Sequence, residues 1–510
     1  MLTWLIRHSD YSGEQMAEIS TDVSGSRLQK NILSLPNCIA LSAAVMGPVL
    51  AVVLNAPAAG PSTGAALPLA FLIALIVILF VGNTVIQFAR VLPSAGSFYT
   101  YASQGLGGGA GFFTGWIFFG AYTLLGPGLF GAVAAFAQDY VKSTFHADLP
   151  WWIFAFIFMA AVLLLSVRSV KASVQLDLTL LTVEVLVFLL LATIAIAKAG
   201  DGNTLSAFSP AAAAGGVSGV GLGVVFGILS FIGFDAAAVL GEESRNPRRL
   251  IPLAVGGSIV VVGIFYVYVM YGLTAGYHLN DAQSLAAFNK DATPFVTLAR
   301  RDAPWLEQLV DLCAIAGLFS AFLALQNTTV RVLFSMGREG ALPAALGKVH
   351  PKFHSPYIAI YVLTAVTVIG GLAGGAWLGP GPTGLYGFTG AVGTVGVILV
   401  YILCNVALIR YFGNRPNRNL FLHVIAPILG SLGLIYPLWS TVAPGQAYPY
   451  NLVPYIVGLY LVVGIGAYFY LRQRAPEKLG AFGSVVADEP ITKAEEGGMF
   501  DDRSAHTHTT

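Results

Sequence analysis

Long apolar runs separated by short polar segments dominate this chain. Twelve runs are about 18 residues or longer, the length that a helix needs to cross the roughly 30 Å hydrocarbon core of a bilayer. Apolar residues are continuous within each run rather than alternating, so the pattern predicts helices and not the strands of a membrane barrel. The predicted spans are 33–55, 67–91, 111–138, 150–167, 176–198, 218–240, 251–276, 306–334, 356–378, 385–411, 421–442 and 452–471.

Composition supports the same fold class, an all-α integral membrane protein. Hydrophobic residues make up 56% of the 510 residues and charged residues only 10%, against roughly 25% charged in soluble domains. The lipid bilayer is therefore the expected solvent, and a net charge of +1 argues against nucleic acid as a partner. We expect a cytoplasmic N-terminal segment at 1–30, a transmembrane domain at 31–472 and a disordered cytoplasmic tail at 473–510.

The distribution of positive charge predicts the orientation. If the N-terminus is cytoplasmic, 21 of the 26 Lys and Arg residues fall on the cytoplasmic side of the twelve spans and five on the other side. Cytoplasmic segments of membrane proteins carry such an excess. We therefore expect both termini inside, in a plasma or bacterial inner membrane.

Two spans contain residues that interrupt a helix. The first span holds Gly47 followed by Pro48, and the sixth holds Gly233, 186 residues after Gly47. Proline removes a backbone donor and glycine permits unwinding. Interrupted helices at corresponding places in two halves point to a transporter binding site at their repeat interface. We therefore predict a five-plus-five inverted repeat, with backbone unwound at Val45–Gly47 and Ser230–Gly233 facing each other.

Three motifs resemble those of the amino acid–polyamine–organocation permeases. They read PSAGSFYTY at 93–101, GFD at 233–235 followed by EESRNPRR at 242–249, and MGREG at 336–340. The resemblance covers about 30–475. It implies the same inverted repeat and secondary transport of a small organic solute by alternating access, driven by an ion gradient or by exchange.

The substrate class stays open between an amino acid and an amine. Members of this family that carry amino acids usually have a small-residue turn in span one whose amides bind the substrate carboxylate. This chain reads SAAVMGP at 42–48, and Pro48 supplies no amide. We expect the substrate to contact Val45, Met46, Gly47, Ser230, Phe231, Gly233, Tyr122 and Asn327. Among these, Phe231 stands where the resemblance implies an aromatic residue that closes over the substrate.

Two carboxylates within the spans are functional candidates. Glu184 is the only acidic residue well inside span five, and a charge at the bilayer centre is costly enough that a lone one suggests function. The resemblance implies a lysine in this part of span five of proton-coupled members. Glu184 is therefore expected to take up a proton, bind a cation or pair with a cationic substrate, and a proton is favoured. For Asp235, just after the second break, we expect a structural or gating role.

An inner gate is expected where charged residues gather near the cytoplasmic surface. Its candidate members are Glu242, Glu243, Arg245 and Arg331, besides Asp235.

Other function classes find little support in the sequence. No Ser/His/Asp or His-rich constellation can be assembled within the spans, so we expect no catalytic residue, no resident metal and no cofactor. The cysteines, Cys38, Cys313 and Cys404, lie far apart in apolar runs. The alternative that remains is a transporter-like membrane sensor, or a facilitator without ion coupling.

Overall fold

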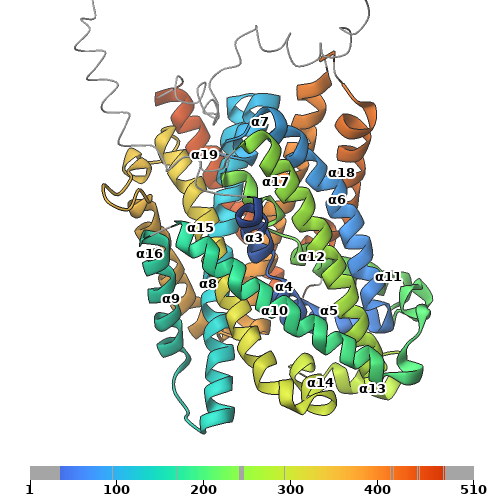
Figure 1. Ribbon diagram of the computed structural model, residues 1–510. Coiled ribbons are helices and arrows are strands. Elements are labelled where there is room, and N and C mark those ends of the chain that lie inside the picture. Colours follow the sequence, from blue (N-terminus) through green and yellow to red (C-terminus); the bar gives the residue numbers. More distant parts are fainter. Residues whose placement is uncertain are drawn as a thin grey trace, which may run out of the picture.

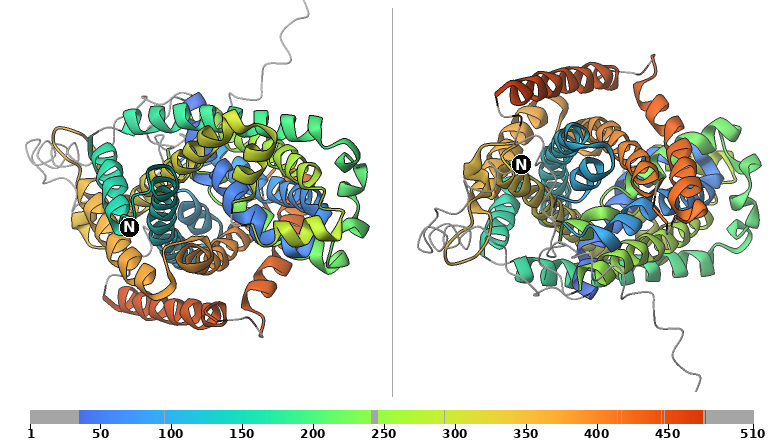
Figure 2. Two further views of the ribbon diagram at one scale, coloured as in Figure 1. Left: turned by 90° about the horizontal axis from the view of Figure 1, so that it is seen from below. Right: turned by 90° about the horizontal axis from the view of Figure 1, so that it is seen from above.

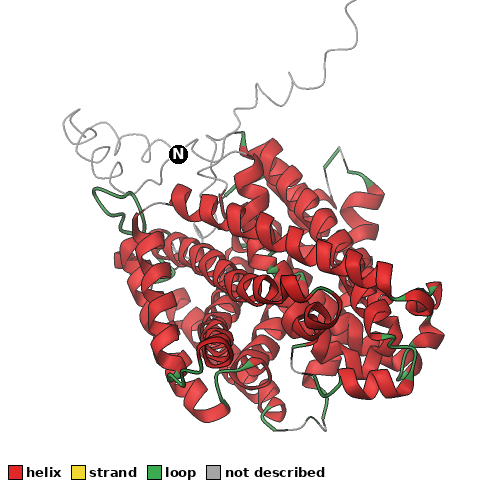
Figure 3. Cartoon of the chain, turned by 60° about the horizontal axis from the view of Figure 1, so that its bottom comes forward, coloured by secondary structure: helices red, strands yellow, loops and turns green. Residues whose placement is uncertain are grey.

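The computed structural model describes residues 35–476, apart from positions 95, 169, 241–245, 292, 414, 417, 445, 447 and 475. Every regular element in this described part is a helix (Figure 3). The all-helical prediction is thus confirmed. The predicted N-terminal segment and nearly all of the predicted tail lie outside the described residues.

Eleven segments of the described part are long and apolar enough to cross a bilayer. The first runs from Leu35 to Val91, over 57 residues, and as one straight helix it would be about 85 Å long. Instead the chain turns back at the 3-10 turn η3, Gly64–Ala66, where Gly64 has φ 50° (Figure 1). This segment therefore supplies two crossings, and the described part contains the twelve that the apolar runs predict.

The first crossing is built from several short helical pieces. Helix α3, Leu35–Met46, ends at Gly47, which has φ 58°. Pro48 then starts α4, Pro48–Leu50, where its missing N–H costs nothing because the first turn of a helix has no acceptor for it. The crossing continues through the π-helix η2, Ala51–Asn55, and α5, Ala56–Thr63; α6, Leu67–Val91, then forms the return crossing.

The sixth crossing is interrupted in the same way. Helix α11, Gly216–Ser230, gives way to turns at 231–233, after which the 3-10 helix η7, Phe234–Leu240, continues the crossing. Gly233 lies at φ 108°, a backbone conformation that residues with a Cβ rarely adopt. Both interruptions predicted from the sequence are therefore present at glycines with positive φ.

The other crossings are continuous helices of 17 to 38 residues. They are α8 Gly108–Phe145, α9 Trp151–Arg168, α10 Val170–Lys198, α12 Pro247–Tyr277, α15 Glu307–Arg338, α16 Tyr357–Leu378, α17 Gly387–Gly413, α18 Ala426–Val442 and α19 Val453–Arg474. Short elements lie on the connections: α7 Phe98–Leu106, η4 Gly200–Gly202, η5 Leu205–Phe208, η6 Pro210–Ala212, α13 Ala282–Phe288, α14 Pro294–Asp302, η8 Pro304–Leu306, η9 Ala344–Gly347, η10 Pro382–Tyr386, η11 Phe421–Ile425 and η12 Tyr450–Leu452.

The two broken crossings lie inside the bundle. Helix α12 packs along α6 and against α3, while α8 packs against α15 and α17. Helices α18 and α19 lie along one edge, and α19 is the least enclosed of the eleven segments (Figure 2). Helices α13 and α14 lie at the end of the bundle opposite α7 (Figure 1).

At the start of α13 the Ser284 amide donates to the Asp281 carboxylate, which lowers the pKa of that carboxyl.

Replacing Gly233 by Ala tests whether the second break depends on glycine. A Cβ at Gly233 would lie 2.3 Å from Cγ1 of Val45 and 2.9 Å from its carbonyl carbon, and the positive φ adds strain of about 1–3 kcal/mol. We expect the purified Gly233→Ala protein to unfold at a lower temperature than the parent. Gly466→Ala is the matched control, because a Cβ there meets nothing within 4 Å. Equal melting temperatures for both variants and the parent would contradict the prediction.

Candidate functional site

The two breaks lie in contact with each other. Gly233 in the sixth crossing packs directly against Val45, the residue two places before Gly47 in the first crossing. A glycine is required there because a Cβ would overlap the Val45 side chain. The structure thus brings the two breaks together as the sequence predicts, but the unwound stretches are shorter than predicted. Val45 and Met46 still belong to α3 and Ser230 to α11, so the breaks themselves are Gly47 and the turns at 231–233.

The hydroxyl of Tyr266 on α12 holds both breaks. Its oxygen lies 3.1 Å from the carbonyl oxygen of Met46, the last residue of α3, and 2.8 Å from that of Ser230, the last residue of α11. Carbonyls at the end of a helix have no partner within that helix, and a buried carbonyl without a donor is costly. One buried hydroxyl therefore serves both interrupted helices with its single proton. Its ring packs edge-on against Phe231 at 5.2 Å between centroids.

Two polar side chains of the first crossing add links to the sixth. Ser42 on α3 donates to the Phe234 carbonyl at 2.9 Å and accepts from the Ala237 amide at 2.8 Å. Asn55, at the end of η2, donates to the Ser230 hydroxyl at 2.9 Å. The broken crossings are therefore tied together on both sides of the break, and all of these groups are buried.

Asp235 is a buried carboxylate with two tyrosine donors. The Tyr122 hydroxyl on α8 lies 3.0 and 3.2 Å from its two oxygens, and the Tyr401 hydroxyl on α17 lies 3.2 Å from one of them. Asp235 therefore anchors the sixth crossing, just after its break, to two other spans.

Glu184 on α10 lies beside the first break and has a different environment. Its side chain is buried, and its Oε1 atom has no hydrogen-bond partner among the described residues. A Cβ on Gly317 of α15 would lie 2.8 Å from both Glu184 Oε2 and Val49 Cβ. Gly317 thus leaves room for a carboxyl group between α10, α15 and the start of α4, where its neighbours are apolar.

Two cavities lie along the breaks. The smaller, here named the break cavity, has a volume of about 40 Å³. It is lined by Val45, Met46, Leu50, Leu125, Leu129, Leu229, Ile232, Leu325 and Tyr386.

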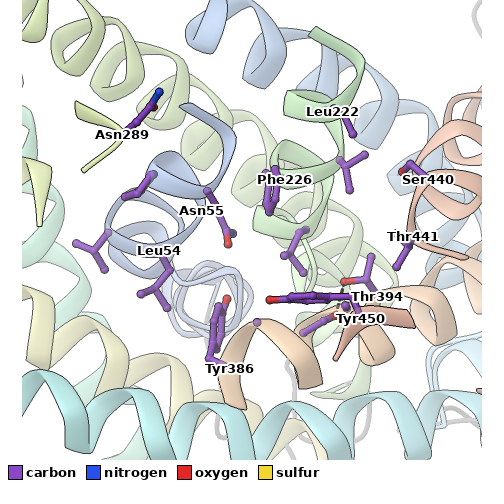
Figure 4. A pocket seen from close by; sticks show the side chains of 18 of the residues that line it. Leu54, Asn55, Leu222, Phe226, Asn289, Tyr386, Thr394, Ser440, Thr441 and Tyr450 are labelled. Carbon is purple, nitrogen blue, oxygen red and sulfur yellow. Dashed lines mark hydrogen bonds between the residues drawn. The ribbon is translucent and has the colours of Figure 1, made fainter. Parts of the chain in front are cut away.

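The larger cavity, here named the vestibule, has a volume of about 600 Å³ (Figure 4). Helices α5, α11 and α17 and the connection after α13 contribute to its walls, with Asn55, Phe226, Thr394 and Asn289 among the lining residues. Leu229 and Tyr386 line both cavities, so these two side chains lie at the boundary between them.

The predicted contact residues divide into three groups by their placement. Val45 and Met46 line the break cavity. Gly47, Ser230 and Gly233 supply backbone at the breaks. Phe231, Tyr122 and Asn327 line neither cavity: Phe231 packs on Tyr266, Tyr122 donates to Asp235, and the Asn327 carbonyl accepts from Arg331 Nη1 at 2.7 Å.

The predicted inner gate is only partly visible. Glu242, Glu243 and Arg245 lie outside the described residues. Arg331 is buried on α15. A further link, between the PSAGSFYTY and MGREG motifs, was not predicted: the Tyr99 hydroxyl on α7 donates to Glu339, just after α15, at 2.9 Å.

Several residues that build the site carry no sequence signal of their own. Tyr266 is one of 21 tyrosines, and its partners are backbone atoms that become available only where two distant helices break. Asn55 is the exception, because a single amide within the apolar residues 49–56 points to a buried hydrogen bond.

Comparisons with known proteins agree with this arrangement. Residues 40–479 match the family model described as amino acid permease. The branched-chain amino acid permease BcaP of Bacillus subtilis is 26% identical over 451 residues, covering 82% of this chain and 88% of that protein. The L-asparagine permease of Streptomyces coelicolor is 26% identical, with coverages of 82% and 86%. The low-affinity putrescine importer PlaP of Escherichia coli is 25% identical, with coverages of 73% and 80%.

Replacing Tyr266 by Phe tests the shared hydroxyl. The ring keeps its packing, but the Met46 and Ser230 carbonyls lose this donor, so we expect the free energy of unfolding to fall by about 1–3 kcal/mol. Thermal unfolding of the purified protein measures this. Tyr268→Phe is the matched control on the same helix, because the Tyr268 side chain is 37% exposed and its hydroxyl pairs with exposed Thr193. If both variants unfold like the parent, the shared hydroxyl contributes nothing to stability.

Proposed function

Because this chain belongs to the amino acid permease family, it is a multi-pass membrane transporter of an amino acid or amine, and we propose that it works by alternating access around the paired breaks. In this proposal the polar part of the substrate binds the backbone at Val45–Gly47 and Ser230–Gly233. The observation that supports it best is the contact between the breaks, with a cavity directly beside them.

The two cavities support a stepwise path for the substrate. The vestibule gives access from one end of the bundle, and Leu229 and Tyr386 separate it from the break cavity. The connection that lines the vestibule at Asn289–Asp291 is on the outer side if the excess of positive charge marks the cytoplasm. We therefore assign this conformation to the outward-facing part of the cycle, with both termini in the cytoplasm of a cell membrane.

We propose that movement of the broken crossings changes the contacts that form the inner gate. Asp235 connects the sixth crossing to α8 and α17 through Tyr122 and Tyr401, so a shift of η7 changes those contacts. Arg331 on α15, with Glu242, Glu243 and Arg245, completes the proposed inner gate. Phe231 is still proposed to close over the substrate, and its packing on Tyr266 connects it to both breaks.

Coupling to an ion gradient is assigned to Glu184. Hydrogen-bond donors stabilise an ionised carboxylate and apolar burial destabilises it. Asp235 accepts from two tyrosine hydroxyls. Glu184 Oε1, by contrast, has no donor among the described residues, and its Oε2 atom lies next to Gly317, which also packs on Val49. Of these two buried carboxylates, Glu184 is therefore the better proton carrier. Its apolar surroundings favour a proton over a metal cation, which requires several oxygen ligands.

The energy available from such coupling is sufficient. One charge that crosses 100 mV releases about 2.3 kcal/mol, which supports roughly a fifty-fold concentration gradient of solute. Glu184 lies beside the first break, so its protonation and the conformation of α4 influence each other.

Replacing Glu184 by Gln tests this assignment. Gln keeps the size of the side chain but cannot ionise, so the variant should exchange substrate across vesicles without accumulating it against a gradient. Its transport rate should also depend less on pH than that of the parent. Reconstituted vesicles with imposed pH and sodium gradients measure both properties. Glu307→Gln is the control, because Glu307, at the start of α15, pairs with exposed Arg300.

Accumulation by Glu184→Gln at the parental level and pH profile would refute a coupling role. If neither the parent nor the variant accumulates substrate under any gradient, the chain is a facilitator or an exchanger without ion coupling.

A further inference from the structure

Three arginine side chains gather where α6 and α17 end and the connection to η11 begins. Arg90 lies in the last turn of α6, and Arg415 and Arg418 lie on the connection that follows α17. All three residues are exposed, whereas His423, in η11, is buried. These four residues are here named the arginine patch.

Aromatic contacts place Arg415 next to the end of α6. The Arg415 Cζ atom lies 4.0 Å from the ring centroid of Tyr411. The Tyr411 ring in turn packs on that of Phe88 of α6, at 5.4 Å between centroids. Because Phe88 precedes Arg90 by two residues, the guanidinium groups from the two helix ends lie in one region of the surface.

His423 connects Arg418 to the same region. Its ring stacks on Phe412 at 3.9 Å between centroids, and it lies close enough to Arg418 and Arg90 for both charges to act on it. The His423 Nδ1 atom accepts from the Asn419 amide at 3.0 Å, so the neutral ring carries its proton on Nε2. The patch therefore adds an uncharged N–H donor to those of the arginines.

The elements that build the patch supply no opposite charge. The chain has no Asp or Glu at residues 23–138 or 340–476, so α6, α17, η11 and α18 contain no acidic residue. At the other end of the bundle, by contrast, Arg300 pairs with Glu307 at 2.8 Å. Positive charges that gather without carboxylates attract an anion from outside the protein.

Apolar side chains continue from the patch along η11 and the start of α18. The exposed ones are Leu420, Phe421, Ile425, Ile428 and Leu429. The surface thus offers guanidinium groups for a phosphate and, beside them, apolar groups for acyl chains. A guanidinium group suits phosphate because it donates two parallel N–H bonds. Basic pockets between the cytoplasmic ends of membrane helices are suited to the head groups of anionic lipids.

We infer that the arginine patch binds the phosphate of an anionic phospholipid whose acyl chains lie along η11 and the start of α18. In the proposed orientation this lipid belongs to the cytoplasmic leaflet. A zwitterionic phospholipid fits less well, because its own ammonium group already balances the phosphate charge. The site lies at the ends of the helices rather than at the breaks, so it does not depend on where the substrate binds.

Lipid binding to the purified full-length protein tests this inference. Native mass spectrometry measures the affinities of phosphatidylglycerol and phosphatidylcholine with the same acyl chains. Glycerol phosphate, which has no acyl chains, is the third ligand. We expect phosphatidylglycerol to bind about tenfold or more tightly than the other two. Equal affinities of phosphatidylglycerol and glycerol phosphate would show a site for free phosphate, and would overturn the assignment to a lipid.

Charge variants test the residues of the patch. Each arginine near an anionic head group contributes about fivefold in affinity, so Arg415→Gln combined with Arg418→Gln should weaken phosphatidylglycerol binding about 25-fold. Arg418→Gln alone, with an expected loss of about fivefold, serves if the double variant does not fold. Arg168→Gln is the matched control, because Arg168 is an exposed arginine in the last turn of α9 and should leave the affinity unchanged.

Two results would overturn the inference. The first is an equal affinity of the parent for phosphatidylglycerol and phosphatidylcholine. The second is an unchanged affinity for phosphatidylglycerol in folded variants that lack Arg415 and Arg418 or Arg418 alone. Either result would leave the chain's own segment 477–510, which carries seven Asp and Glu residues, as the better candidate partner for the patch.

Discussion

The site depends on one shared hydrogen bond at the centre of the bundle. Lipid supplies no partner for free backbone groups, so a helix broken inside a membrane needs donors and acceptors from the protein. Tyr266 supplies a hydroxyl to the carbonyls that end both α3 and α11. Because one side chain serves two breaks, the interruptions are held next to each other and next to α12. The contact of Gly233 with Val45 and the position of the break cavity follow from this arrangement.

The same constraint explains why two buried carboxylates are assigned different roles. Asp235 lies where tyrosine hydroxyls meet it, so its charge is stabilised and it connects the sixth crossing to α8 and α17. Glu184 lies in a space that Gly317 leaves open, between apolar groups. In the proposed coupling, its protonation state responds to the geometry of the first break.

Local signals in the sequence were enough for the fold and for the position of the breaks. Continuous apolar runs determine the spans, and the first TM segment yields two of them only because the chain turns back at Gly64. Gly47, Pro48 and Gly233 mark the breaks because their backbone preferences are local properties. Glu184 stood out because a lone acid in an apolar run is costly in any packing.

The contacts that a side chain makes with other helices could not be predicted from the sequence in the same way. The hydrogen bond from Tyr122 to Asp235 was not predicted, since the long and largely apolar α8 gives no indication of which face meets which neighbour. The leucines of the break cavity are of the same residue type as exposed leucines, such as Leu312. Tyr266 gains its role only from two carbonyls that belong to distant segments.

Substrate protection of a cysteine at the breaks tests the central claim most directly. Val45 lines the break cavity, and Cys38, Cys313 and Cys404 are all buried, so Val45→Cys provides a thiol at the proposed site. We predict that a small thiol reagent labels this cysteine in vesicles and that a transported substrate slows the labelling. Val217→Cys, at a position 79% exposed at the start of α11, should be labelled at the same rate with and without that substrate. If a transported substrate leaves the labelling of Val45→Cys unchanged, the substrate does not bind at the paired breaks.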